Sequence, residues 1–149
     1  MKPDVPVVMR GLFGTMLMEI APNLTAEYSA GSIGIMSMMI FMTAEEYDRA
    51  AEIRAAENAE MRALFAEASG LVEDAGLKVK LAEAGQGKDG SLRISALDAE
   101  NAALAALLIE LQAHVEESTG AQAAGLEARI WDHLVAAADR RKLTFPALG

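Results

Sequence analysis

Apolar residues recur at helical spacing along most of the chain. This pattern predicts helices over about residues 6–20, 25–42, 44–69, 96–118 and 122–142. Pro22 separates the first predicted helix from the second. The Thr43-x-x-Glu46 spacing is typical of a capping box, so we expect a separate helix to begin near residue 44. The sequence therefore predicts an all-α bundle of about five helices in a single domain over residues 1–149, with an apolar N-terminal helical hairpin over 6–42.

Residues 77–95 have a different pattern. Apolar and polar residues alternate at period two on either side of the glycine-rich segment 85–90. Such alternation favours a small β-hairpin or an irregular segment, although residues 80–84 could equally form a short helix.

Polar residues interrupt the apolar stripes of two predicted helices at equivalent places. At about 100° per residue, Arg54, Glu57 and Asn58 fall inside the apolar arc of the third helix, as Glu100 and Asn101 do in the fourth. The two Ala-Glu-Asn-Ala segments lie 43 residues apart, which chance or an internal duplication would explain.

These positions allow two interpretations. Their side chains can lie at the edge of the stripe, where the carboxylates reach water or pair with Arg54 and Arg93. Alternatively, they form an interior polar pocket that binds a small molecule or a metal ion, since buried carboxylates and amides need partners. The candidate interior cluster comprises Arg54, Glu57, Asn58, Glu100, Asn101 and His133.

No motif selects a particular chemistry. Neither His114 nor His133 has a glutamate three residues before it, so a bundle di-iron site is not expected. The chain has no cysteine, no Gly-x-Ser-x-Gly and no phosphate-binding glycine motif. We therefore expect no metal and no cofactor, and an enzyme is the less favoured class.

Bulky apolar residues are concentrated near the N-terminus. Of the 78 apolar residues 30 are alanine, whereas eight of the nine methionines lie in the first 42 residues, and the first 44 residues carry only five charges. The three amphipathic helices are rich in alanine and cannot readily cover both helices of this apolar hairpin. A homodimer formed through the hairpin is therefore favoured. The candidate interface residues are Gly34, Met36, Met38, Met39, Phe41 and Met42.

The segment Tyr28–Ala44 is a possible membrane span because it holds 17 residues without a charge. That is the lower end of the spanning range, the flanks are acidic, and no lysine or arginine follows before Arg49. The interior of a soluble bundle or a subunit interface explains the segment better, so a membrane is an unlikely partner. Arg10 also interrupts the N-terminal apolar stretch, which argues against a secretory signal.

The net charge of −9 disfavours binding to nucleic acid. The basic run at residues 140–142 suits the C-terminal end of the last helix, and the absence of cysteine fits the cytoplasm. The sequence thus predicts a cytoplasmic, non-enzymatic module that binds a second copy of itself or another protein. The alternative is a helical bundle, possibly an enzyme, that binds a small molecule or metal.

Overall fold

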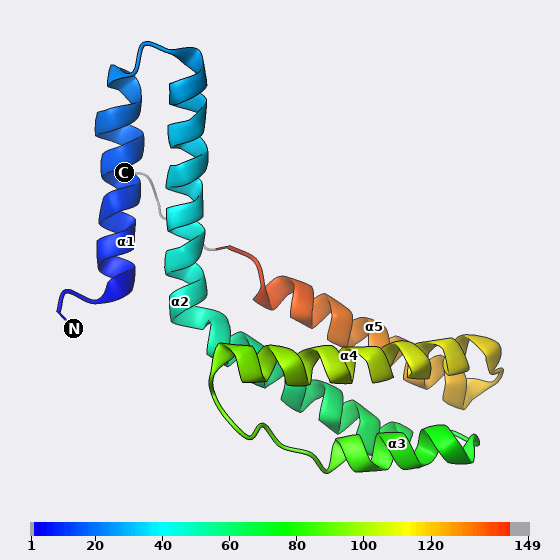
Figure 1. Cartoon of the computed structure of the whole chain (residues 1–149). Helices are drawn as coiled ribbons and strands as arrows, with labels where there is room; N and C mark the ends of the chain where they lie inside the picture. Colours follow the sequence, from blue (N-terminus) through cyan, green and yellow to red (C-terminus); the bar gives the residue numbers. More distant parts are fainter. Residues whose placement is uncertain (1, 144–149) are drawn as a thin grey trace. The chain divides into compact units, whose positions relative to one another are not determined.

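The computed structural model describes residues 2–143 and contains five α-helices and no strand in that range (Figure 1). The helices are α1 (Val5–Gly14), α2 (Glu27–Ala68), α3 (Ala75–Gly85), α4 (Ile94–Glu117) and α5 (Ala121–Arg140). A π-helical turn (Thr15–Ile20) and a 3-10 turn (Ala21–Asn23) extend α1. The prediction of an all-α bundle is confirmed.

One predicted helix boundary is absent, because α2 runs without a break through residue 43. The Thr43 hydroxyl donates to the Met39 carbonyl at 2.8 Å, four residues earlier, as a hydroxyl inside a helix does. A capping box begins a helix only where the preceding backbone is not helical. The uncharged residues before Thr43 are already helical, so the expected start at residue 44 was wrong.

The segment predicted as a β-hairpin or irregular stretch begins with helix α3. Leu77 and Leu81 are both buried, and a spacing of four places them on one helical face, whereas the alternation in the sequence is too short to distinguish helix from strand. The Asp74 carboxylate accepts a hydrogen bond from the Leu77 amide at 2.6 Å and caps the helix. At its other end, a Cβ at Gly85 would lie 2.8 Å from the Ala66 backbone nitrogen, so only glycine fits there.

The chain divides into two units, and helix α2 contributes to both. Unit 1 contains the N-terminal residues to Ala50, together with Leu143, and unit 2 contains Ala51–Lys142. In unit 1, α1 and the first half of α2 lie antiparallel (Figure 1). The Phe13 and Phe41 rings pack with centroids 5.4 Å apart, and Arg10 Nη2 lies 2.9 Å from Glu45 Oε1.

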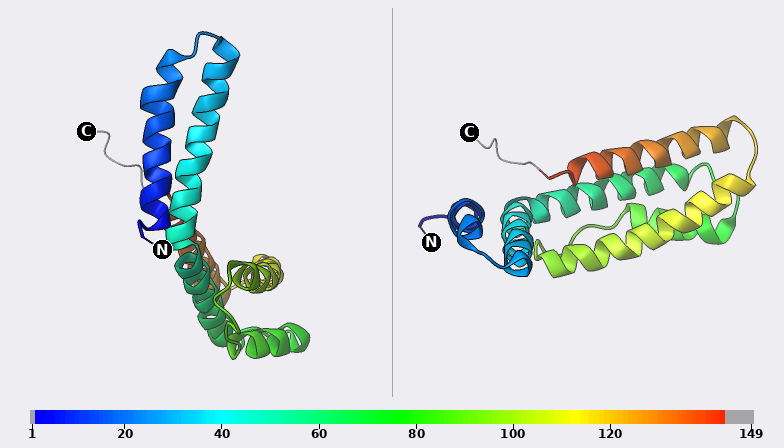
Figure 2. Two further views of the ribbon diagram at one scale, coloured as in Figure 1. Left: turned by 60° about the vertical axis from the view of Figure 1, so that its left-hand side comes forward. Right: turned by 90° about the horizontal axis from the view of Figure 1, so that it is seen from above.

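Unit 2 holds a core made by the second half of α2 together with α3, α4 and α5. Helix α4 packs against both α3 and α5 (Figure 2), and Gly120, at a φ of 107°, allows the tight turn between α4 and α5. The most deeply buried apolar side chains of this core are Phe65, Leu81, Leu111 and Ile130.

Candidate functional site

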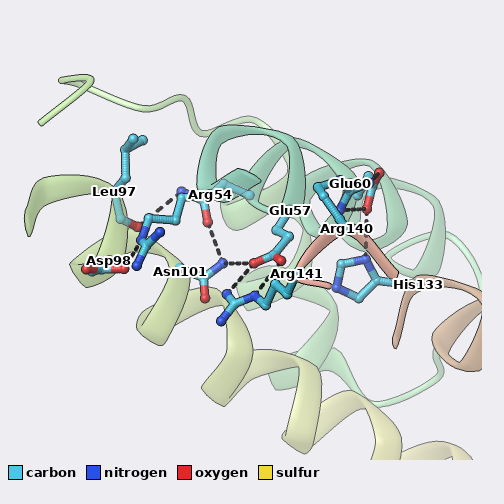
Figure 3. A network of polar contacts seen from close by, with 10 residues as sticks. Arg54, Glu57, Glu60, Leu97, Asp98, Asn101, His133, Arg140 and Arg141 are labelled. Carbon is cyan, nitrogen blue, oxygen red and sulfur yellow. Dashed lines mark hydrogen bonds and ion pairs between the residues drawn. The ribbon is translucent and has the colours of Figure 1, made fainter. Parts of the chain in front are cut away.

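The two Glu-Asn steps found in the sequence meet in unit 2. Glu57 and Asn58 on α2 are both buried, and Asn101 on α4 reaches them (Figure 3). The Asn101 Nδ2 donates to Asn58 Oδ1 at 3.0 Å and to Glu57 Oε2 at 3.3 Å. Three of the polar residues that interrupt the apolar stripes, Glu57, Asn58 and Asn101, are therefore joined by hydrogen bonds between the two helices.

Asn58 is the centre of this network. Its side chain is fully buried, and its Nδ2 donates to Asp89 Oδ1 at 3.0 Å and to the Leu97 carbonyl at 3.3 Å. Its Oδ1 accepts the bond from Asn101. Asn58 thus ties the loop before α4, and the first turn of α4, to α2.

Arg62 lies one turn further along α2 and extends the network. Its Nη1 donates to Asp89 Oδ1 at 2.8 Å, and its Nη2 donates to Glu100 Oε2 at 3.1 Å. The Arg62 side chain is buried, whereas that of Glu100 is half exposed. Glu100 therefore lies at the rim of the network, where water also reaches it.

Glu57 has an ionic partner that binds both of its carboxylate oxygens. Arg141 donates to it through two parallel hydrogen bonds, Nε to Oε1 at 2.7 Å and Nη2 to Oε2 at 2.5 Å. Burial raises the pKa of the Glu57 carboxyl, but the hydrogen bonds and charge of Arg141, aided by Asn101 and the charge of Arg140, hold that pKa below its ordinary value. Glu57 is therefore a carboxylate at neutral pH, and it fixes the C-terminal end of α5 on α2.

The other two candidate residues lie outside this set of contacts. Arg54 forms an ion pair with Asp98 at the exposed edge of α4. His133 Nδ1 lies 3.3 Å from Glu60 Oε2, and Arg140 binds both oxygens of Glu60 (Figure 3). His133 and Glu60 thus form a separate contact between α5 and α2.

The buried polar groups of the network satisfy one another, so they offer little free capacity to a ligand. Within residues 2–143, no group of three or more histidine, aspartate or glutamate side chains is placed to hold a metal ion. A cavity of about 530 Å³ lies between α2 and α5, beside His133, Glu60 and Asp132. A second, of about 320 Å³, lies near Leu126 and His114. Neither cavity is lined by Glu57, Asn58 or Asn101.

Sequence reasoning missed the cationic partners and Asp89. Arg62 follows Asn58 by four residues, which places it on the same helical face, and this spacing was an available signal. The basic run at the end of the last helix was assigned to the helix dipole alone, yet Arg140 and Arg141 bind Glu60 and Glu57. Asp89 lies in a loop, where periodicity carries no information.

The candidate interface residues lie in unit 1, and most are exposed. Met36, Met38, Met39 and Met42 are between 39% and 62% exposed, and a Cβ at Gly34 would meet nothing within 4 Å. Phe41 differs, because its ring is buried and packs against Phe13 inside unit 1. Phe41, one of the candidate interface residues, is therefore part of the packing inside unit 1.

Helix α1 and the turns that extend it add further exposed apolar residues, which the interface prediction did not include: Val7, Val8, Leu12, Met18 and Ile20. Unit 1 thus exposes large apolar side chains on both of its helices.

Comparisons with models of protein families, with curated proteins and with solved structures find no significant match to this chain.

Proposed function

We propose that this chain is a non-enzymatic assembly module of the cytoplasm. Unit 1 binds unit 1 of a second copy of the chain. Unit 2 is a stable helical domain, and this self-association joins two copies of it. The observation that carries the proposal is the exposed apolar surface of unit 1. Monomeric proteins rarely leave so many large apolar side chains in water on one small element. Covering them by self-association is the simplest way to remove that cost.

The glycines of unit 1 support the same proposal. An added Cβ at Gly11, Gly14, Gly31 or Gly34 would meet nothing within 4 Å, so these residues do not serve a close contact inside the described chain. Each glycine lowers the helix propensity by about 1 kcal/mol relative to alanine. Close approach of a helix from a second copy would compensate for that cost.

The network of unit 2 supports a non-enzymatic role. A binding or catalytic site needs groups that are free to contact a substrate, whereas Glu57, Asn58 and Asn101 already bind each other, Arg141 and Asp89. These contacts stabilise the domain. The alternative, a bundle with an interior ligand site, is supported by the buried His133 Nδ1, which has no hydrogen-bond partner among the described residues and lies beside the 530 Å³ cavity.

Sedimentation velocity of the full chain tests the proposal. The wild-type protein should sediment as a dimer at micromolar concentration, and Met39→Glu should shift it towards the monomer because it places a charge on the apolar surface. Ile109→Glu is the matched control, since Ile109 is 68% exposed, like Met39 at 62%, but belongs to unit 2. A wild-type monomer, or an equal shift by both variants, would contradict the proposal.

A further inference from the structure

The first helical segment of unit 1 is long and apolar, yet unburied. From Val5 to Asn23 the backbone is helical over 19 residues with a mean hydropathy of 1.2, and none of these residues is buried. The core helix of a soluble protein can have the same composition, but such a helix is covered by the rest of the protein. Among the residues that the structure describes, α2 covers one side of this segment, where Phe13 packs against Phe41, and the other side chains of the segment are partly or fully exposed.

From this we propose that unit 1 crosses a lipid bilayer as a helical hairpin. The segment Val5–Asn23 forms one span, the first part of α2 forms the other, and the turn between them lies on the far side. The inference rests on the proposed function in one respect, since both require that the apolar surface of unit 1 is covered. It differs in naming lipid as the cover for most of that surface, and it reverses the expectation from sequence that a membrane is an unlikely partner.

The lengths of the two segments agree with this arrangement. Nineteen helical residues at 1.5 Å each extend over roughly 28 Å, close to the 30 Å of a bilayer hydrocarbon core. The uncharged segment Tyr28–Ala44 extends over roughly 26 Å by the same measure. Val5–Asn23 is the one helical segment of the described residues that is long and apolar enough to cross by itself, and Tyr28–Ala44 has the lower end of the spanning length beside it.

Polar side chains within the hairpin have partners that suit a lipid environment. Ser37 Oγ donates to the Ile33 carbonyl at 2.7 Å, and Thr43 makes the equivalent bond to Met39, so both hydroxyls are satisfied by their own helix. Arg10, the sixth residue of the segment Val5–Asn23, pairs with Glu45, which directly follows Ala44 and whose side chain is 5% exposed. Paired charges near a membrane surface cost much less than isolated charges at its centre.

The apolar surface of α2 is too broad for a single contact with one other helix. At about 100° per residue, the exposed side chains from Met38 through Ile35 to Met36 cover an arc of roughly 160°, and Phe41 faces α1 on the opposite side. Helices that are apolar all round are found in large cores or in membranes. Lipid covers such an arc completely, and the open glycines still allow a second copy to approach within the bilayer.

The distribution of basic residues gives the hairpin an orientation. Lys2, Arg10 and Arg49 lie towards its open end, whereas residues 19–27 at the turn contain no lysine or arginine. Basic residues flanking membrane spans remain on the cytoplasmic side. Unit 2 begins at Ala51, directly after the open end, and is therefore cytoplasmic, as the proposed function also requires.

Fractionation of cells that express the full chain tests this inference. The protein should sediment with membranes, resist an alkaline carbonate wash and dissolve only in detergent. Leu12→Lys combined with Met39→Lys places two charges in the spans and should lower the membrane-bound fraction by at least about tenfold. The matched control is Ile109→Lys combined with Val135→Lys, which changes two exposed apolar residues of unit 2 and should leave the fraction unchanged.

Cysteine labelling tests the orientation without depending on how the lysine variants fold, because the chain has no cysteine of its own. A membrane-impermeant maleimide should label an Asn23→Cys variant in cells whose outer layers admit the reagent but whose cytoplasmic membrane is sealed. It should not label a Lys88→Cys variant until the membrane is broken. Equal labelling of both variants before lysis would overturn the inference.

The outcomes separate this inference from the proposed function. A dimer that stays in the supernatant without detergent overturns membrane insertion and leaves self-association intact. A membrane-inserted monomer overturns self-association and leaves insertion intact. Release by carbonate, or an intact mass that shows removal of the segment up to Asn23 as a signal sequence, overturns the spanning hairpin.

Discussion

The pair formed by Glu57 and Arg141 offers the sharpest test of how unit 2 is stabilised. Arg141→Met removes the charge and both hydrogen bonds while keeping most of the length of the side chain. Among the described residues, the Glu57 carboxylate, which is 3% exposed, then keeps the 3.3 Å hydrogen bond from Asn101 and the charge of Arg140 nearby. A buried charge that loses its partner is the main source of the expected destabilisation.

The expected size follows from the exposure of the two side chains. Breaking a fully buried ion pair costs about 3–5 kcal/mol. Because the Arg141 side chain is 53% exposed, water can partly replace it, and we expect a loss of about 1–3 kcal/mol in the free energy of unfolding of unit 2. For a domain of this size, each kcal/mol lowers the melting temperature by about 4–8 °C.

Urea unfolding followed by tryptophan fluorescence measures this loss, since Trp131 on α5 is the only tryptophan and reports on unit 2. Arg129→Met is the matched control. The Arg129 side chain is 54% exposed and lies 2.5 Å from Glu67, which is itself 40% exposed, so its loss should cost less than about 0.5 kcal/mol. Equal unfolding free energies for the two variants would refute the argument that burial of Glu57 makes its pair important.

Three further predictions concern the same unit. Since the folded-state pKa of Glu57 is lowered, its contribution is complete above the ordinary glutamate pKa and is lost as the pH falls through the lowered folded-state pKa, so the difference between wild type and Arg141→Met should shrink in acid-titrated unfolding curves. Asn58→Ala should lower the unfolding free energy by about 2–4 kcal/mol in the same urea assay, because it removes three hydrogen bonds of a fully buried side chain and leaves a cavity; a loss below about 1 kcal/mol would contradict a central role. Gly85→Ala should cost about 1–3 kcal/mol in calorimetry because its Cβ would clash with backbone, whereas Gly90→Ala, which meets nothing within 4 Å, should be tolerated.

The helical character of the chain could be predicted from its sequence because it depends on local periodicity. The fourth and fifth helices begin and end within two residues of the expected positions. The boundary at Thr43 failed because a capping motif has no effect when the backbone before it is already helical. Helix α3 was predicted only as one alternative, over residues 80–84, because Leu77 and Leu81 fit both periods over so short a segment.

The candidate site could be predicted only in part, for a related reason. Glu57, Asn58 and Asn101 were recognisable because polar residues in an apolar stripe require an explanation, and the structure brings them together. Their partners are distant in sequence: Asp89 lies 31 residues from Asn58, and Arg141 lies 84 residues from Glu57. Contacts over such separations are decided by packing, which no local pattern contains.

The continuity of α2 has a consequence for how the two units can be taken apart. Boundaries between structural units usually fall in exposed linkers, where proteases cut and where recombination exchanges modules. Here the boundary between Ala50 and Ala51 falls inside a 42-residue helix, whose backbone amides and carbonyls are hydrogen-bonded to one another. Limited proteolysis should therefore spare this position, and a gene fragment that begins at Ala51 would encode unit 2 without the helical turns that precede its first residue.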